Sequence, residues 1–436
     1  MTRVGRTIAA TAAIVLLGTA CTIGQRSVSE GPRATRSPGP PSPRSTASPA
    51  AASPATGDPL CPPSPKPTAT PERAGTLPAP LAAVADQVEG VRELRFEHPV
   101  GAQPVTRTKM QQLLAASFDQ NYPIARIRAQ GRALIAIGAL PPGTDLVQAL
   151  RDFSSGQVIG YFDTQSKHLV FIGTPNPTPF QRFTLAHELT HALDDQHFDL
   201  SRSDRIPLCE GDRSAAYTSL AEGDATQTQY EWATRTLSGP ELLQLQNEAA
   251  AFPAPPEVPE FVQEELEFPY TAGQRFVEAL QARGGESAVD AAFRDPPVST
   301  EQILHPDRYP SDAPQELTVP DLAAKLGTGW KAIDREETGE EDLRTLLRLR
   351  LSSGAADDAA AGWDGGEYLA WAKGSTQTAV MLETVWDSAA DADQFAGAIL
   401  QWGEGQPIKV EHQGTSVTVL FASDGTSLRA VEHVTG

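Results

Sequence analysis

The chain contains 436 residues, more than one ordinary hydrophobic core holds, which indicates two folded domains with extensions. Its formal net charge is −20 at pH 7. Such an excess of negative charge repels phosphates, so the composition argues against nucleic acids and anionic membrane surfaces as partners.

The first 21 residues have the layout of an export signal. Positive charge comes first, an apolar run follows over residues 8–17, and small residues lead to Cys21. The run is too short for a permanent membrane-spanning helix. The last five residues resemble a bacterial lipoprotein cleavage site, although Gly18 stands where a larger aliphatic residue is usual. We expect Cys21 to become the lipidated first residue, with an ordinary cleaved signal as the alternative.

Residues 22–80 consist largely of Pro, Ser, Thr and Ala. A segment with so few large apolar side chains buries too little surface to fold, so we expect a disordered tether behind the anchor. Cys61 and Cys209 remain as an even pair. In an oxidising compartment such a pair favours a disulfide, with two unpaired thiols as the alternative.

Residues 81–314 are expected to form a mainly helical domain with a small β-hairpin. Helical apolar spacing marks Leu81–Val91 and Met110–Phe118, and the Gly- and Pro-rich stretch 138–143 interrupts it. β-rich runs at Val158–Phe162 and His168–Ile172 flank a polar turn and predict the hairpin.

The best-marked helix of this domain begins after Thr178. Thr178 suits the N-cap, Pro179 the first helical position, and Gln181 the capping-box partner. We expect this helix to run from Pro179 to about Asp195. Further helices are predicted at Asp212–Leu237 and Ala272–Ala282, with a Pro-rich loop at 252–259.

Residues 315–436 are expected to form a smaller domain with an antiparallel sheet. Apolar side chains on one face predict helices at Glu341–Leu351 and Asp391–Trp402. Strands are predicted at Tyr368–Ala372, Thr378–Trp386, Ile408–His412, Ser416–Phe421 and Leu428–Val431. Helices set against an antiparallel sheet are typical of an α+β protein, which is the predicted fold class.

The sequence His187-Glu188-Leu189-Thr190-His191 lies within the predicted helix 179–195. Four residues turn through about 400° of a helix, so the two imidazoles project from one face, one turn apart. They can then share one tetrahedral zinc ion. Glu188 lies on the flank of that face, where it can take a proton from zinc-bound water without ligating the metal. Two surface histidines on an ordinary helix are the alternative.

A catalytic zinc needs a third protein ligand. Glu222 lies on the next predicted helix and can face the histidines if the two helices pack antiparallel. His197 has metzincin spacing, but Asp194 replaces the metzincin Gly, and a helix that continues turns His197 about 240° away from His191. Asp224 is a further alternative. We favour Glu222 and leave the other two open.

The pairing of this helix with a later helical Glu resembles the gluzincin group of zinc metallopeptidases. The resemblance covers about residues 158–309 and is specific only at the metal motif. It implies that His187, His191 and Glu222 bind zinc and that Glu188 is the general base. The sequence departs from the thermolysin-like pattern at Thr226, where an Asp is usual, so the group that orients a zinc histidine is unassigned.

Peptide hydrolysis also needs a donor for the oxyanion. His305, just before a Pro at an expected helix end, is the first candidate, followed by Tyr270 and Tyr309. A packed structural histidine is the alternative for His305. A sheet edge at Leu169–Ile172 would let an extended peptide pair along it.

These features together predict a zinc-dependent endopeptidase. We expect it to act on peptides or proteins outside the cytoplasmic membrane, anchored there only through lipid on Cys21. The alternative is a catalytically silent, zinc-containing binding lipoprotein of the cell envelope. The intact Glu188 argues against this alternative, since a structural zinc site needs no base beside it.

Overall fold

The computed structural model describes residues 58–63, 77–121, 123–156, 158–173, 176–252 and 256–435. The predicted signal, Cys21 and most of the predicted tether lie outside these residues. In the described part, every helix is too short or too polar to span a bilayer.

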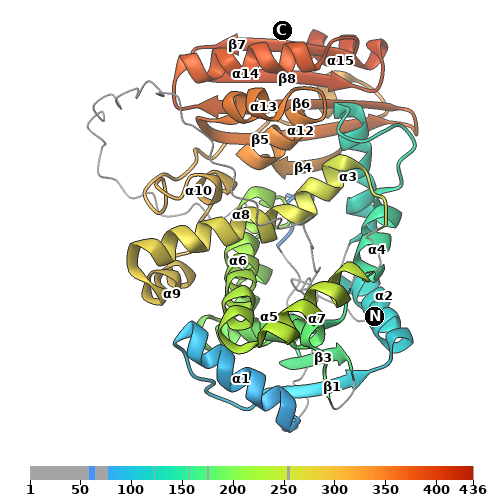
Figure 1. Ribbon diagram of the computed structural model, residues 1–436. Coiled ribbons are helices and arrows are strands. Elements are labelled where there is room, and N and C mark those ends of the chain that lie inside the picture. The colour runs from blue at the N-terminus through green and yellow to red at the C-terminus, as the bar shows by residue number, and fades with distance from the viewer. Residues whose placement is uncertain are drawn as a thin grey trace.

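The first half of the protein is mainly helical. Its helices are α1 (Ala79–Arg92), α2 (Arg107–Asn121), α3 (Ile124–Ile137), α4 (Leu146–Gly156), α5 (Pro179–Phe198), α6 (Gly211–Thr236), α7 (Gly239–Ala250), α8 (Glu260–Gly284), α9 (Glu286–Arg294) and α10 (Thr300–Leu304), with a 3₁₀ turn at Leu200–Arg205. Its strands are β1 (Gly101–Val105), β2 (Gly160–Asp163) and β3 (His168–Ile172). Figure 1 shows the three-stranded sheet at the opposite end of the molecule from the C-terminal sheet, with α5, α6 and α8 between them.

The second half is built around a five-stranded antiparallel sheet. Its strands are β4 (Trp330–Glu337), β5 (Trp363–Lys373), β6 (Gln377–Trp386), β7 (Ile408–Gln413) and β8 (Ser416–Ala422), in the order β4-β5-β6-β8-β7. Its helices are α11 (Ala323–Leu326), α12 (Glu340–Arg348), α13 (Ser353–Ala360), α14 (Ala389–Trp402) and α15 (Gly425–Thr435). The α+β fold class is therefore confirmed.

Both faces of this sheet carry core packing, because successive side chains of a strand point to opposite faces and those of β6 are mostly buried. Val380 and Leu382 pack on one face with α12–α14, whereas Ala379 and Met381 pack on the other with Val431 of α15. Ile127 and Ala133 of α3 belong to the first of these cores. The core beneath the C-terminal sheet thus extends across the predicted boundary at 314/315.

Three element predictions are corrected by the structure. Leu428–Val431, predicted as a strand, lies in helix α15. The helix predicted at Ala272–Ala282 begins at Glu260 and includes Pro269. Strand β3 is not a sheet edge, because β1 pairs with it in parallel on one side and β2 antiparallel on the other. An incoming peptide therefore cannot pair along Leu169–Ile172.

The predicted disulfide is confirmed between Cys61 and Cys209. The short segment around Cys61 is also held by backbone hydrogen bonds, since the Leu208 amide donates to the Pro62 carbonyl. The Arg126 guanidinium of α3 donates to the carbonyls of Leu60 and Leu208. This segment is thereby joined to the start of α6.

Helices α6 and α8 cross at two glycines. A Cβ on Gly223 would lie 2.2 Å from the carbonyl carbon of Gly273, and a Cβ on Gly273 would lie 2.1 Å from the carbonyl oxygen of Ser219. Both contacts are with backbone, which no rotamer change can relieve. The crossing sets the position of α8 beside Glu222, the neighbour of Gly223.

We expect Gly223→Ala to destabilise the protein by about 3 kcal/mol or more, at the upper end of overpacking effects. Gly90→Ala on α1 is the matched control, since its Cβ would meet nothing within 4 Å. The control should stabilise by up to about 1 kcal/mol, the helix-propensity difference. Urea unfolding midpoints give the stability of both variants. Equal stability of Gly223→Ala and Gly90→Ala would contradict the tight crossing.

Candidate metal centre

Helix α5 carries both histidines of the motif in its buried middle. Thr178 and Gln181 form the predicted capping box, and the helix continues to Phe198, three residues beyond the predicted end. His187 and His191 are each 1% exposed. Their rings lie 4.7 Å apart between centroids, with planes at 86°. One turn of α5 therefore brings two buried imidazoles together, as predicted.

Glu222 of α6 completes a triangle with these imidazoles. The two Nε2 atoms lie 3.1 Å apart, and Oε2 of Glu222 lies 3.2 Å from Nε2 of His187 and 3.5 Å from Nε2 of His191. Within the described part of the chain, these three residues form a buried group that can hold a metal ion. The favoured third ligand is thus brought to the histidines.

The size of this triangle matches a tetrahedral ion. Around zinc, with ligand distances of about 2.0–2.1 Å, adjacent corners of a tetrahedron lie about 3.3–3.4 Å apart. The three measured edges of 3.1, 3.2 and 3.5 Å bracket that value. The donor set, two imidazoles and one carboxylate, is one that zinc accepts in catalytic sites.

The protonation states also suit ligation. Burial lowers the pKa of the His187 imidazole, and the hydrogen bond that Glu222 accepts from it acts in the opposite direction. Burial alone would raise the pKa of Glu222, but the imidazoles of His191 and His187 lower it to about 2. Neutral imidazole and ionised carboxylate are the forms that bind a metal.

Glu188 lies beside this group and is fully buried. Its Oε2 accepts a hydrogen bond of 2.7 Å from the backbone N–H of Phe162 in β2. The predicted hairpin therefore holds the carboxylate of the predicted base in place. Because the carboxylate lies on the flank of the histidine face, it is not one of the three ligands.

The alternative third ligands have other partners. Helix α5 continues past Asp194, and the His197 ring turns away to lie 2.7 Å from the Arg95 carbonyl oxygen. Asp224 accepts a hydrogen bond of 2.8 Å from Arg92. Neither belongs to the group formed by His187, His191 and Glu222.

The three candidate oxyanion donors have different surroundings. Nε2 of His305 lies 2.9 Å from Oε1 of Glu340 on α12, and nearby Thr300 donates to Asp212, ten residues before Glu222 on α6. The Nε2 of His305 is thus engaged by a carboxylate of the second half of the protein. Tyr309 donates its hydroxyl to the Asp295 carbonyl. Tyr270 of α8 is the candidate that lies at the site, with its ring stacked on His187 at 6.2 Å between centroids.

Sequence reasoning missed the buried ion cluster behind the site. Arg92 of α1 is fully buried and pairs with four carboxylates from three helices. These are Asp194 of α5 at 3.1 Å, Asp224 of α6 at 2.8 Å, and Glu286 at 2.6 Å and Asp290 at 3.2 Å on α9. Asp194 and Asp224 follow His191 and Glu222 by three and two residues, so this Arg92 cluster ties together the two helices that carry the ligands.

One cation does not neutralise four carboxylates. Burial raises the pKa of Asp194 and Asp224, and Arg92 only partly opposes it. Burial and Asp224 raise the pKa of Glu286 to about 7. Burial thus disfavours ionisation of these carboxyls, whereas the Arg92 guanidinium favours it. The one feature of the sequence that could have indicated this cluster is Arg92, a charged residue on the apolar face of α1.

Comparisons with known proteins give little information about the metal centre. Residues 324–432 match the model of a family described as Domain of unknown function (DUF8575). Among solved structures, the chain is similar to a protein from Chloroflexus aurantiacus provisionally described as a hydrolase with a novel fold, at 17% identity and a TM-score of 0.34, over 52% of this chain and 85% of that chain. No curated protein matches. The geometry of the candidate metal centre is therefore the main indication of function.

Proposed function

We propose that this protein is a zinc-dependent endopeptidase, anchored by lipid on Cys21, that cleaves peptide bonds outside the cytoplasmic membrane. The observation that carries the proposal is the buried triangle of His187, His191 and Glu222, with edges of 3.1–3.5 Å. The Cys61–Cys209 disulfide supports an oxidising compartment outside the cytoplasm.

Each residue of the site has a separate role in the proposed reaction. His187, His191 and Glu222 would hold zinc, which when bound acts as a Lewis acid and makes water a nucleophile near pH 7. Glu188, held by the Phe162 amide, takes the proton of the attacking water and passes it to the leaving amine. Tyr270, beside His187, donates a hydrogen bond to the oxyanion.

Zinc binding tests the ligand set directly. We expect the metal-free full chain to take up one zinc ion, measured by calorimetry and elemental analysis. His187→Ala and Glu222→Ala should weaken zinc binding by more than the about 10–100-fold loss that outer-shell changes cause.

His197→Ala is the matched control and should bind zinc as the wild type does, because its ring contacts the Arg95 carbonyl. Loss of zinc binding in His197→Ala, with retention in Glu222→Ala, would reject the proposed ligand set. Full retention in all three variants would show that zinc binds elsewhere.

A further inference from the structure

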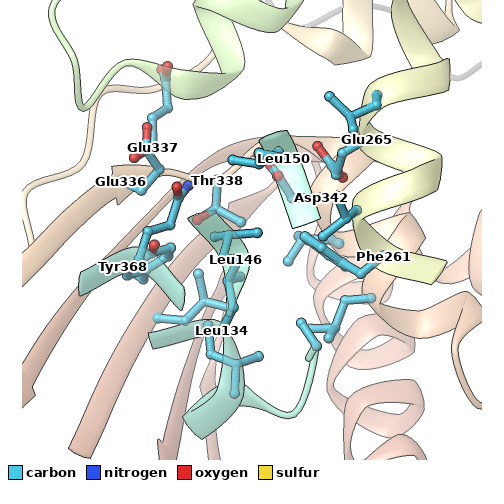
Figure 2. A pocket seen from close by; sticks show the side chains of 18 residues that line it. Leu134, Leu146, Leu150, Phe261, Glu265, Glu336, Glu337, Thr338, Asp342 and Tyr368 are labelled. Carbon is cyan, nitrogen blue, oxygen red and sulfur yellow. The ribbon is translucent and has the colours of Figure 1, made fainter. Parts of the chain in front are cut away.

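A partly enclosed cavity of about 180 Å³ lies between α8, the α3–α4 region, α12 and the C-terminal sheet. Its wall is mostly aliphatic. The apolar lining includes Leu134, Leu146, Leu150, Val262, Leu266 and Leu346. Figure 2 shows Leu134, Leu146 and Leu150 between Glu265 on one side of the cavity and Glu336, Glu337 and Tyr368 on the other. An apolar cavity of about 150 Å³ is large enough for a six-carbon ligand.

Four acidic side chains line this cavity, and three of them have partners. Glu336 pairs with Arg126 at 2.5 Å, Glu337 accepts from the Arg213 amide at 3.1 Å, and Asp342 accepts from the Gly339 amide at 2.7 Å. Oε1 of Glu265 is buried and, among the described residues, has no hydrogen-bond partner. The cavity therefore presents one buried carboxyl oxygen, Oε1 of Glu265, that has no hydrogen-bond partner among the described residues.

A buried carboxyl that lacks a hydrogen-bond partner on one oxygen is costly to keep ionised. Burial and the neighbouring acid Asp342 raise the pKa of Glu265 well above its usual value, and Arg344 only partly opposes them. A ligand that ends in a cation would give Glu265 its missing partner, and an aliphatic stem would fill the leucine-lined space. The complementary ligand is a straight aliphatic chain with a terminal ammonium group.

The cavity is close to the metal centre along α8. Leu266 lines the cavity, and Tyr270, which stacks on His187, lies one turn further on the same helix face. One turn is about 5.4 Å, and successive residues of an extended peptide are about 3.4 Å apart. A residue within two or three positions of a peptide bond held at the metal centre can therefore reach the cavity.

We propose that this cavity is the specificity pocket of the enzyme, and that it receives a lysine side chain of the substrate with its ammonium group on Glu265. The proposal rests on the proposed peptidase function. It predicts that wild type cleaves lysine peptides with a kcat/KM about 10–100-fold higher than matched norleucine peptides, which lack only the ammonium group.

Glu265→Gln tests the assignment, because Gln imitates the protonated carboxyl without the charge. The variant should lose the preference for lysine over norleucine peptides. Glu278→Gln, at an exposed position of the same helix, is the matched control and should keep the preference. Cleavage by wild type with no lysine preference, or a preference that survives in Glu265→Gln, overturns the proposal.

A binding experiment separates the pocket from the catalytic activity. Full-length metal-free protein should bind n-pentylamine about 10–100-fold more tightly than 1-pentanol by calorimetry, and Glu265→Gln should reduce this ratio to near one. If neither probe binds, or if the ratio is unchanged in Glu265→Gln, the pocket assignment is wrong. Amine binding without cleavage of any peptide contradicts the proposed function alone and supports the ligand class of the pocket.

Discussion

Glu188→Gln is expected to lower kcat for an unfolded protein substrate by about 10²–10⁴-fold, the usual contribution of a general base. The Gln side chain can still accept the hydrogen bond that the Phe162 amide donates to Glu188, so the hairpin and α5 should stay in place. Zinc binding should also be retained, because Glu188 is not among the three grouped ligands.

The measurement is proteolysis of an unfolded protein, with zinc content determined on the same samples. A variant that binds one zinc and has lost activity supports the base assignment. Activity equal to wild type would remove Glu188 from the mechanism. If neither protein cleaves any substrate while both bind zinc, the silent binding lipoprotein becomes the better description.

Arg92→Met is expected to lower the free energy of unfolding by about 3–5 kcal/mol, the cost of leaving buried charge without its partner. Met fills similar space but removes every hydrogen bond to Asp194, Asp224, Glu286 and Asp290. Because two of these acids follow metal ligands closely on α5 and α6, zinc affinity should also fall by about 10–100-fold, as for other supporting residues.

Arg95→Met is the matched control for this cluster. The Arg95 side chain is 82% exposed and pairs only with Glu89 among its described ion-pair partners, so its loss should cost at most about 1 kcal/mol. Urea unfolding and zinc titration of both variants give the comparison. An Arg92→Met protein as stable as Arg95→Met, with unchanged zinc affinity, would show that the cluster does not position the ligands.

The local parts of the site could be predicted from sequence because they depend on neighbouring residues. Thr178 and Gln181 cap α5 through contacts three residues apart, and His187 and His191 meet through one helical turn. The hairpin β2–β3 is joined by a short polar turn. Errors arose where local patterns were ambiguous: the short apolar run Leu428–Val431 suits a strand or a helix equally.

Strands that pair with segments far away in the sequence were also not predicted. Strand β1 contains Gly101 and Pro104, which locally disfavour a strand, and it exists because β3, more than sixty residues later, pairs with it. Strand β4 likewise pairs with β5 across two intervening helices. No short-range pattern encodes such pairs.

The sequence by itself determined the helix with His187 and His191 on one face, since that placement follows from a fixed 100° turn per residue. Tertiary structure decided which distant groups meet there. The close crossing of α6 and α8 at Gly223 and Gly273 brings Glu222 and Tyr270 to the histidines, whereas His305 is held by Glu340. These choices depend on how helices pack, which is set by shape and burial over the whole molecule and not by spacing along one segment.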